Sequence, residues 1–194
     1  MRSLLIFVLV AAATPAFAHT GVGTTVGIAD GFFHPLGGVD HILTMLGVGL
    51  FATVLGGRAL WLVPLSFVVM MAAGGALGMM GLAIPYVEIG IACSVVALGA
   101  MLTLQWKFPA AVAAALVGLF AIFHGHAHGA EMPDSASGLQ YGAGFVLATA
   151  LLHCAGIAVG VVIGLLSGRL YPRITQAAGA AMAIAGIAML SAFI

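Results

Sequence analysis

The chain has 194 residues, of which 63% are hydrophobic and 5% are charged, and its formal net charge is zero. A mean hydropathy of +1.27 excludes a soluble globular domain, because the outside of such a domain must be wet. The few charges form no basic patch or charged tail, which excludes a nucleic-acid-binding protein. The composition therefore predicts an all-α membrane protein embedded in the lipid bilayer.

Residues 1–18 have the pattern of a cleaved secretory signal peptide. Arg2 supplies a positive charge, residues 4–13 form an apolar stretch, and residues 16–18 form a cleavage site of the A-x-A type. An uncleaved first helix is the alternative interpretation. Cleavage would leave His19 at the new N-terminus, either as a flexible end or as a metal ligand through its amine and imidazole.

Six apolar stretches follow, and each approaches the roughly 20 residues that a membrane-spanning helix requires. Pro35, Pro85 and Pro109 lie at predicted helix starts, and Gly56-Gly57 ends the first stretch. The sequence therefore predicts a six-transmembrane-helix bundle over residues 19–194. The predicted spans are residues 35–55, 59–80, 84–105, 109–128, 139–166 and 174–193.

Glycines recur every four residues in two of these stretches, a spacing that permits close helix approach in lipid. They are Gly74 and Gly78 in the second span, and Gly156, Gly160, Gly164 and Gly168 in the fifth. We interpret them as packing residues without a chemical role.

Positive residues fall only in alternate loops of the mature chain, at Arg58, Lys107, Arg169 and Arg173. Such loops remain on the cytoplasmic side. A secretory signal places the mature N-terminus outside, so the two cues agree. We therefore expect a multi-pass protein of the bacterial inner membrane, with both termini and most histidines on the periplasmic side.

The segment from His34 to His41 (HPLGGVDH) is the first of two polar motifs, which together hold five of the seven histidines and two of the five acids. His34 and His41 are seven residues apart, close to two helical turns, which predicts a shared helix face. Asp40 can either ligate a metal or hold the second ring nitrogen of His41. A charged group inside a membrane is costly, which favours function over an Asp–His pair that only neutralises itself.

The second motif, from Phe123 to Glu131 (FHGHAHGAE), lies at the outer end of the fourth span. His124 and His128 are spaced i, i+4, which places both imidazoles on one helix face, as metal chelation requires. Glu131 follows and can add an oxygen ligand. His126 points away from that face and is either a further ligand or a wet interfacial histidine.

Two other polar residues interrupt the apolar spans. His153 lies near the middle of the fifth span, where it is either a ligand on a transport path or an interhelical hydrogen bonder. Glu88 lies near the outer end of the third span, as a ligand or as an interfacial carboxylate. Histidine with carboxylate suits divalent nickel, cobalt, zinc or iron.

The two motifs resemble those of the HupE/UreJ family of nickel/cobalt permeases. The family's first signature, H-P-x-x-G-x-D-H, is matched at His34, Pro35, Gly38, Asp40 and His41. Its second, F-H-G-x-A-H-G-x-E, is matched at Phe123, His124, Gly125, Ala127, His128, Gly129 and Glu131, and His126 falls on a variable position. The resemblance covers essentially the whole chain. It implies an inner-membrane permease for nickel or cobalt, often linked to hydrogenase or urease maturation.

The leading functional hypothesis is a secondary transporter or facilitator that imports a divalent transition metal. His34, His124, His128 and Glu131 would capture the ion, Asp40 and His41 would take it into the bundle, and His153 would relay it past the midplane. The ion is then the substrate, Ni²⁺ or Co²⁺, and no prosthetic group is expected. No G-x-x-x-x-G-K-[ST] loop is present, so the chain itself hydrolyses no ATP.

Two other functional classes remain as alternatives. A membrane metal sensor or metallocentre-assembly partner would bind the ion without moving it. An intramembrane metalloenzyme would use metal-bound water, but the chain has no H-E-x-x-H base, and we expect no enzyme. The sequence is compatible with a homo-oligomer.

Overall fold

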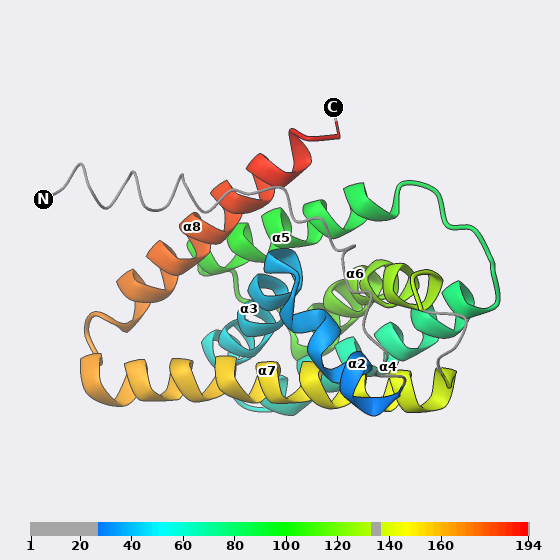
Figure 1. The fold of residues 1–194 in the computed structure, drawn as a ribbon. Helices are drawn as coiled ribbons and strands as arrows, with labels where there is room; N and C mark the ends of the chain where they lie inside the picture. Colours follow the sequence, from blue (N-terminus) through cyan, green and yellow to red (C-terminus); the bar gives the residue numbers. More distant parts are fainter. Residues whose placement is uncertain (1–26, 133–136, 194) are drawn as a thin grey trace, which may run out of the picture.

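The computed structural model describes residues 27–132 and 137–193, which form seven α-helices and one 3-10 turn without a strand (Figure 1). The predicted all-α class is confirmed for these residues. The predicted signal peptide and His19 lie outside them. The elements are α2 (Ile28–Phe33), η1 (His34–Leu36), α3 (Val39–Leu55), α4 (Ala59–Met79), α5 (Val87–Thr103), α6 (Ala110–Ala130), α7 (Gly138–Ser167) and α8 (Tyr171–Leu190).

Four of these helices, α4, α6, α7 and α8, are long and apolar enough to cross a membrane. The segment from α2 through η1 to α3 adds a fifth crossing if it is counted as one span, although it bends by 85°. Helix α5 has 17 residues, which at 1.5 Å per residue span about 25 Å of a hydrocarbon core of about 30 Å. Every predicted stretch is thus helical, but length and composition identify four to five spans among the described residues, not six.

The predicted single helix over residues 35–55 is wrong, because the chain breaks at Gly37-Gly38. Gly38 is extended (φ −100°, ψ 121°) and precedes the first turn of α3. A side chain at Gly38 would press against Asp40 Oδ1 at 2.7 Å and His41 Nδ1 at 3.0 Å. The glycine therefore leaves room for the Asp–His pair.

Helices α4 and α6 pack closely because glycines from both lie in their contact. A Cβ atom at Gly74 or Gly78 would collide with backbone carbonyls of α6, and one at Gly125 or Gly129 would collide with backbone carbonyls of α4. The predicted packing role of Gly74 and Gly78 is confirmed. The two glycines of the second motif share this role, which places the end of α6 directly against α4.

The glycine ladder of α7 acts over only half its predicted length. Cβ atoms at Gly156 and Gly160 would meet α3, whereas one at Gly168 would meet no atom within 4 Å. At the start of α7, Gly144 accommodates the backbone of α2 in the same way. Figure 1 shows α2 lying against this first half of α7. This contact fixes the position of the short segment that carries His34.

The two ends of the bundle differ in chemistry. At one end the ammonium group of Lys107 donates a hydrogen bond to the carbonyl of Val54, and Thr53 bonds the Tyr171 hydroxyl at 2.9 Å. The loops that carry the basic residues therefore meet at the end where α3, α5 and α7 finish. The start of α3 and the end of α6, with both polar motifs, lie at the opposite end.

We predict that Gly74→Ala destabilises the protein, because the added methyl group collides with the backbone of α6. Overpacking of this kind costs about 1–3 kcal/mol and should lower the melting temperature of the detergent-solubilised protein. Gly142→Ala is the matched control, since a Cβ at that helical position meets no atom within 4 Å. Equal melting temperatures for the two variants would show that the α4–α6 contact is not tight.

Candidate metal centre

The two polar motifs meet at one end of the bundle, where three imidazoles are almost completely enclosed. His41 belongs to the first turn of α3, and His124 and His128 to the last two turns of α6. Their relative exposures are 5%, 0% and 5%. The helix-face prediction for His124 and His128 is confirmed, because both rings lie against the ring of His41, with centroids 4.8 and 4.1 Å away.

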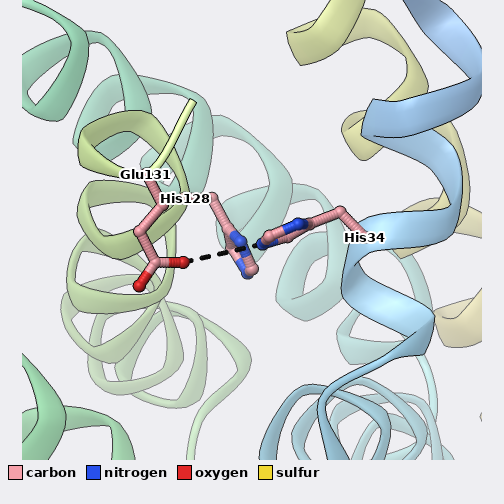
Figure 2. A group of neighbouring side chains, drawn as sticks. All are labelled: His34, His128 and Glu131. Atoms are coloured by element: carbon pink, nitrogen blue, oxygen red, sulfur yellow. Dashed lines mark ion pairs between the residues drawn. The ribbon is translucent and has the colours of Figure 1, made fainter. Parts of the chain in front are cut away.

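An outer group consists of His34, His128 and Glu131. Each offers one ligand atom, and these atoms lie within 4.8 Å of one another. His34 Nε2 and Glu131 Oε2 are 3.6 Å apart, and both residues are partly exposed. In Figure 2 the ring of His128 lies between the other two side chains. The outer group thus combines two imidazoles with a carboxylate that follows the last turn of α6.

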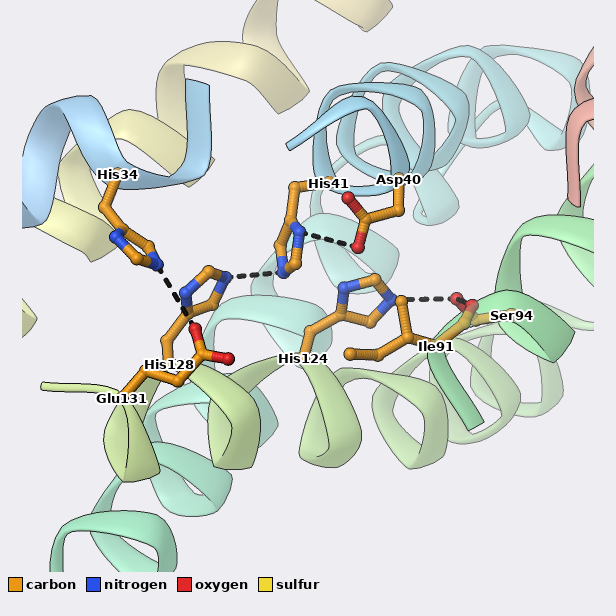
Figure 3. Close-up of polar contacts among 8 residues, drawn as sticks. All are labelled: His34, Asp40, His41, Ile91, Ser94, His124, His128 and Glu131. Carbon is orange, nitrogen blue, oxygen red and sulfur yellow. Dashed lines mark hydrogen bonds and ion pairs between the residues drawn. The ribbon is translucent and has the colours of Figure 1, made fainter. Parts of the chain in front are cut away.

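An inner group consists of Asp40, His41, His124 and His128 (Figure 3). Asp40 Oδ2 lies 3.0 Å from His41 Nδ1. The carboxylate therefore holds the proton on Nδ1 and leaves a lone pair on Nε2, the arrangement that often orients a metal-binding histidine.

The Nε2 atoms of His41 and His128 face each other at 2.5 Å. Facing lone pairs would repel each other, so the two nitrogens share one proton in a hydrogen bond. Because Asp40 holds the proton of His41 on Nδ1, His128 Nε2 is the donor. His128 therefore belongs to both groups and connects them.

His34 and His41 converge for a reason other than the predicted one. They do not share a helix face, because the 85° bend separates η1 from α3. Instead, both rings approach His128, with centroids 4.6 and 4.1 Å from its own. The tight packing of α2 on α7 holds His34 in place before the bend.

Two candidate residues lie outside both groups. His126 is buried, with 7% exposure, and its Nε2 lies 2.6 Å from the carbonyl oxygen of Leu82. The alternative of a wet interfacial histidine is therefore wrong. Glu88 is exposed in the first turn of α5 and is absent from the outer group. His126 therefore contacts the loop before α5, and Glu88 does not join the outer group.

His153 is deeply buried in α7, with 2% exposure. Neither ring nitrogen has a hydrogen-bond partner among residues 27–132 and 137–193. The alternative of a satisfied interhelical hydrogen bonder is therefore wrong. The Phe67 ring lies against His153 and His124, with centroids 5.1 and 5.7 Å away. An aromatic side chain of α4 thus separates His153 from the inner group.

Sequence reasoning missed two residues that contact the inner group. Phe67 is one of eleven phenylalanines in the chain, and an aromatic residue in an apolar span carries no local signal of function. Ser94 lies 2.8 Å from His124 Nε2 but is thirty positions away in sequence. An isolated hydroxyl in an apolar helix was its only signal. With Thr44, these two residues also line a small cavity beside the inner group.

The arrangement fits a borderline divalent cation such as nickel or cobalt. Imidazole nitrogens and carboxylate oxygens are suitable donors, and aromatic rings lie against His124 and His128. The role of each candidate residue as a metal ligand remains a prediction. The candidates are His34, Asp40, His41, His124, His128 and Glu131 in the two groups, and His153, which lies apart. The fold and the cluster together define a multi-pass helical membrane protein with a histidine–carboxylate centre at one end.

Comparison with known proteins agrees with this class. The family model described as HupE / UreJ protein matches residues 7–189. The chain is also 45% identical over 183 residues to Protein HupE of Rhizobium leguminosarum bv. viciae, with 94% of each chain covered. No solved structure matches. The chain therefore belongs to the HupE/UreJ family, which confirms the resemblance found in the two motifs.

We predict that Asp40→Asn weakens nickel binding by roughly 10- to 100-fold, the usual effect of losing the partner that orients a ligating histidine. The amide lacks the negative charge that holds the proton on His41 Nδ1. Isothermal titration of the purified protein with nickel chloride measures the change. Glu88→Gln is the control, because it removes a carboxylate outside both groups, and its affinity should equal that of the wild type. An unaltered affinity in Asp40→Asn would remove Asp40 from the site.

Proposed function

We propose that this protein is a secondary transporter that imports a divalent transition metal, nickel or cobalt, across the bacterial inner membrane. The observation that carries the proposal is the shared position of His128. A site that only stores or senses an ion needs one set of ligands. Two sets joined by one imidazole give the ion a place to move.

The route begins at the outer group, where the side chains of His34 and Glu131 are partly exposed. There the carboxylate of Glu131 and two imidazoles replace part of the ion's hydration shell. The ion then passes across the His128 ring to the inner group, where Asp40 adds a second negative charge. Fixed ligands must bind strongly enough to admit the ion and weakly enough to release it. Successive sites that each replace only part of the hydration shell meet this requirement better than one site that encloses the ion completely.

The next step leads past Phe67 toward His153. The Phe67 ring lies against both His124 and His153, so passage requires this ring to turn aside. The cavity lined by Thr44, Phe67 and Ser94 lies on the same side of the inner group as the Ser94–His124 contact. His153, which has two unpartnered nitrogens, then offers the next donor.

The placement of charge supports the proposed orientation. The basic loops lie at the end opposite both ligand groups, and positive loops remain cytoplasmic. The ligand groups then face the periplasm, together with both termini. We propose six crossings, with α5 spanning the membrane beside α6 and α8 despite its length. The imported ion is the substrate, and family membership links this supply to hydrogenase or urease maturation.

We predict that His128→Ala reduces nickel uptake to the level of empty vesicles, because it removes a ligand from both groups. Accumulation of radioactive nickel in proteoliposomes measures the effect. His126→Gln is the matched control from the same motif, since glutamine keeps an N–H donor for the Leu82 carbonyl and should leave uptake unchanged. Uptake by His128→Ala vesicles at the wild-type rate would contradict the route.

The same vesicles distinguish the other functional classes. If the wild type binds nickel but accumulates none, the protein is a sensor or an assembly partner. If it shows a turnover that a chelator abolishes, it is an enzyme. We expect accumulation without turnover.

We predict that His153→Leu makes the protein more stable but slows transport. A buried polar group without a partner costs about 1–3 kcal/mol, so an apolar side chain of similar size should raise the melting temperature. Nickel affinity should stay at the wild-type value, because His153 lies outside both groups. The maximal uptake rate should fall at least severalfold. An unchanged rate in a more stable protein would remove His153 from the route.

A further inference from the structure

Ser94 is unusual among the buried residues of α5, because it alone has a polar side chain there. Its relative exposure is 2%. The hydroxyl group makes two short contacts, one to the carbonyl oxygen of Ile91 at 2.6 Å and one to His124 Nε2 at 2.8 Å (Figure 3). Neither family motif includes this residue.

The two contacts together determine which nitrogen of His124 carries the proton. A hydroxyl group has a single proton to donate, and the Ser94 hydroxyl donates it to the Ile91 carbonyl, which can only accept. With its proton on the Ile91 carbonyl, the Ser94 oxygen accepts from His124, an arrangement that places the proton of the neutral imidazole on Nε2. The lone pair of His124 then lies on Nδ1.

His124 Nδ1 is buried and has no hydrogen-bond partner within the described parts of the chain. In Figure 3 this nitrogen lies on the side of the ring that faces His41, away from Ser94. His41 in turn presents the lone pair of Nε2, because Asp40 holds the proton on Nδ1. The Nε2 lone pair of His41 faces His128. The ring of His124 lies against that of His41, with centroids 4.8 Å apart. Asp40 and Ser94, from different helices, thus orient two neighbouring imidazoles.

We propose that Ser94 is a positioning residue of the metal centre. By accepting the Nε2 proton of His124, it presents the Nδ1 lone pair as a third imidazole donor beside His41 and His128. The ligand is a divalent cation that prefers nitrogen donors. The inference rests on the proposed function only in its choice of ion, because the proton position is a property of the metal-free protein.

A merely structural role is the competing explanation. A buried serine often returns its hydroxyl to a backbone carbonyl in the preceding turn of its own helix. In that case the loss of Ser94 would affect folding, and its effect on metal binding would not depend on His124. The two explanations therefore differ in a measurable coupling between the two residues.

The first experiment locates the proton directly. Nitrogen NMR of the metal-free wild-type protein, with labelled histidine and with His124→Gln to assign the signal, distinguishes the two forms of the ring. We expect the His124 proton on Nε2. A proton on Nδ1 would overturn the proposal, whatever the protein transports.

The second experiment is a double-mutant cycle on nickel affinity, measured by titration of nickel chloride into the purified full chain. Ser94→Ala should weaken binding roughly 10- to 100-fold in the wild type, as expected for loss of a residue that orients a ligand. In the His124→Gln background the same change should have little effect. Ser94→Thr keeps a hydroxyl group and should retain the wild-type affinity.

Equal losses of affinity from Ser94→Ala in both backgrounds would overturn the proposal and indicate a structural role. His124→Asn provides a second background should the glutamine variant fail to fold. Neither measurement depends on flux. A wild type that binds nickel with this coupling but accumulates none would therefore overturn the transporter proposal and leave the assignment of Ser94 intact.

Discussion

The arrangement of both ligand groups depends on the close approach of His41 and His128. Their facing nitrogens bring the first turn of α3 against the last turn of α6. This approach is possible because glycines let α6 lie directly on α4 and because Gly38 leaves space for the Asp40 carboxylate. A single extra methyl group at these positions would push the two helices or the Asp–His pair apart. The glycines and the histidines of the two motifs therefore form one functional unit.

The inner group and, apart from it, His153 keep polar atoms in surroundings that disfavour them. Among the described residues, Nδ1 of His124 and of His128 and both nitrogens of His153 are buried without a hydrogen-bond partner. Each such atom costs about 1–3 kcal/mol, and a protein gains nothing in stability by keeping them. A lone pair without a hydrogen bond is, however, what a cation needs from its ligand. The instability of the metal-free centre and its readiness to bind a metal therefore have the same origin.

The bend before α3 explains how a membrane-spanning segment can begin with several polar residues. A continuous helix would carry His34 along the axis of α3, away from the end of α6. The break at Gly37-Gly38 instead turns the chain by 85° and directs His34 back toward His128. The packing of α2 on the start of α7 buries Gly31 and fixes the segment before the break, whereas Leu36, Gly37 and Val39 at the break itself are exposed.

The sequence alone determined the helical class, the approximate position of each helix and the residues that carry the chemistry. Long apolar runs, prolines and glycines act locally, so their meaning does not depend on the rest of the chain. The i, i+4 spacing of His124 and His128 belongs to this category, because helix geometry alone sets it. The composition of the two motifs was equally informative, since histidine and carboxylate are rare in apolar spans unless they have a function.

Only the tertiary structure decided how these residues are divided and connected. The bend that separates His34 from the axis of α3, the placement of His126 on a loop carbonyl and the isolation of His153 behind Phe67 all depend on contacts between distant segments. Ser94 became visible only when α5 was placed against α6. Such contacts arise from the packing of whole helices, and no local pattern encodes them, because the partner of each side chain is chosen by the shape of the assembled bundle.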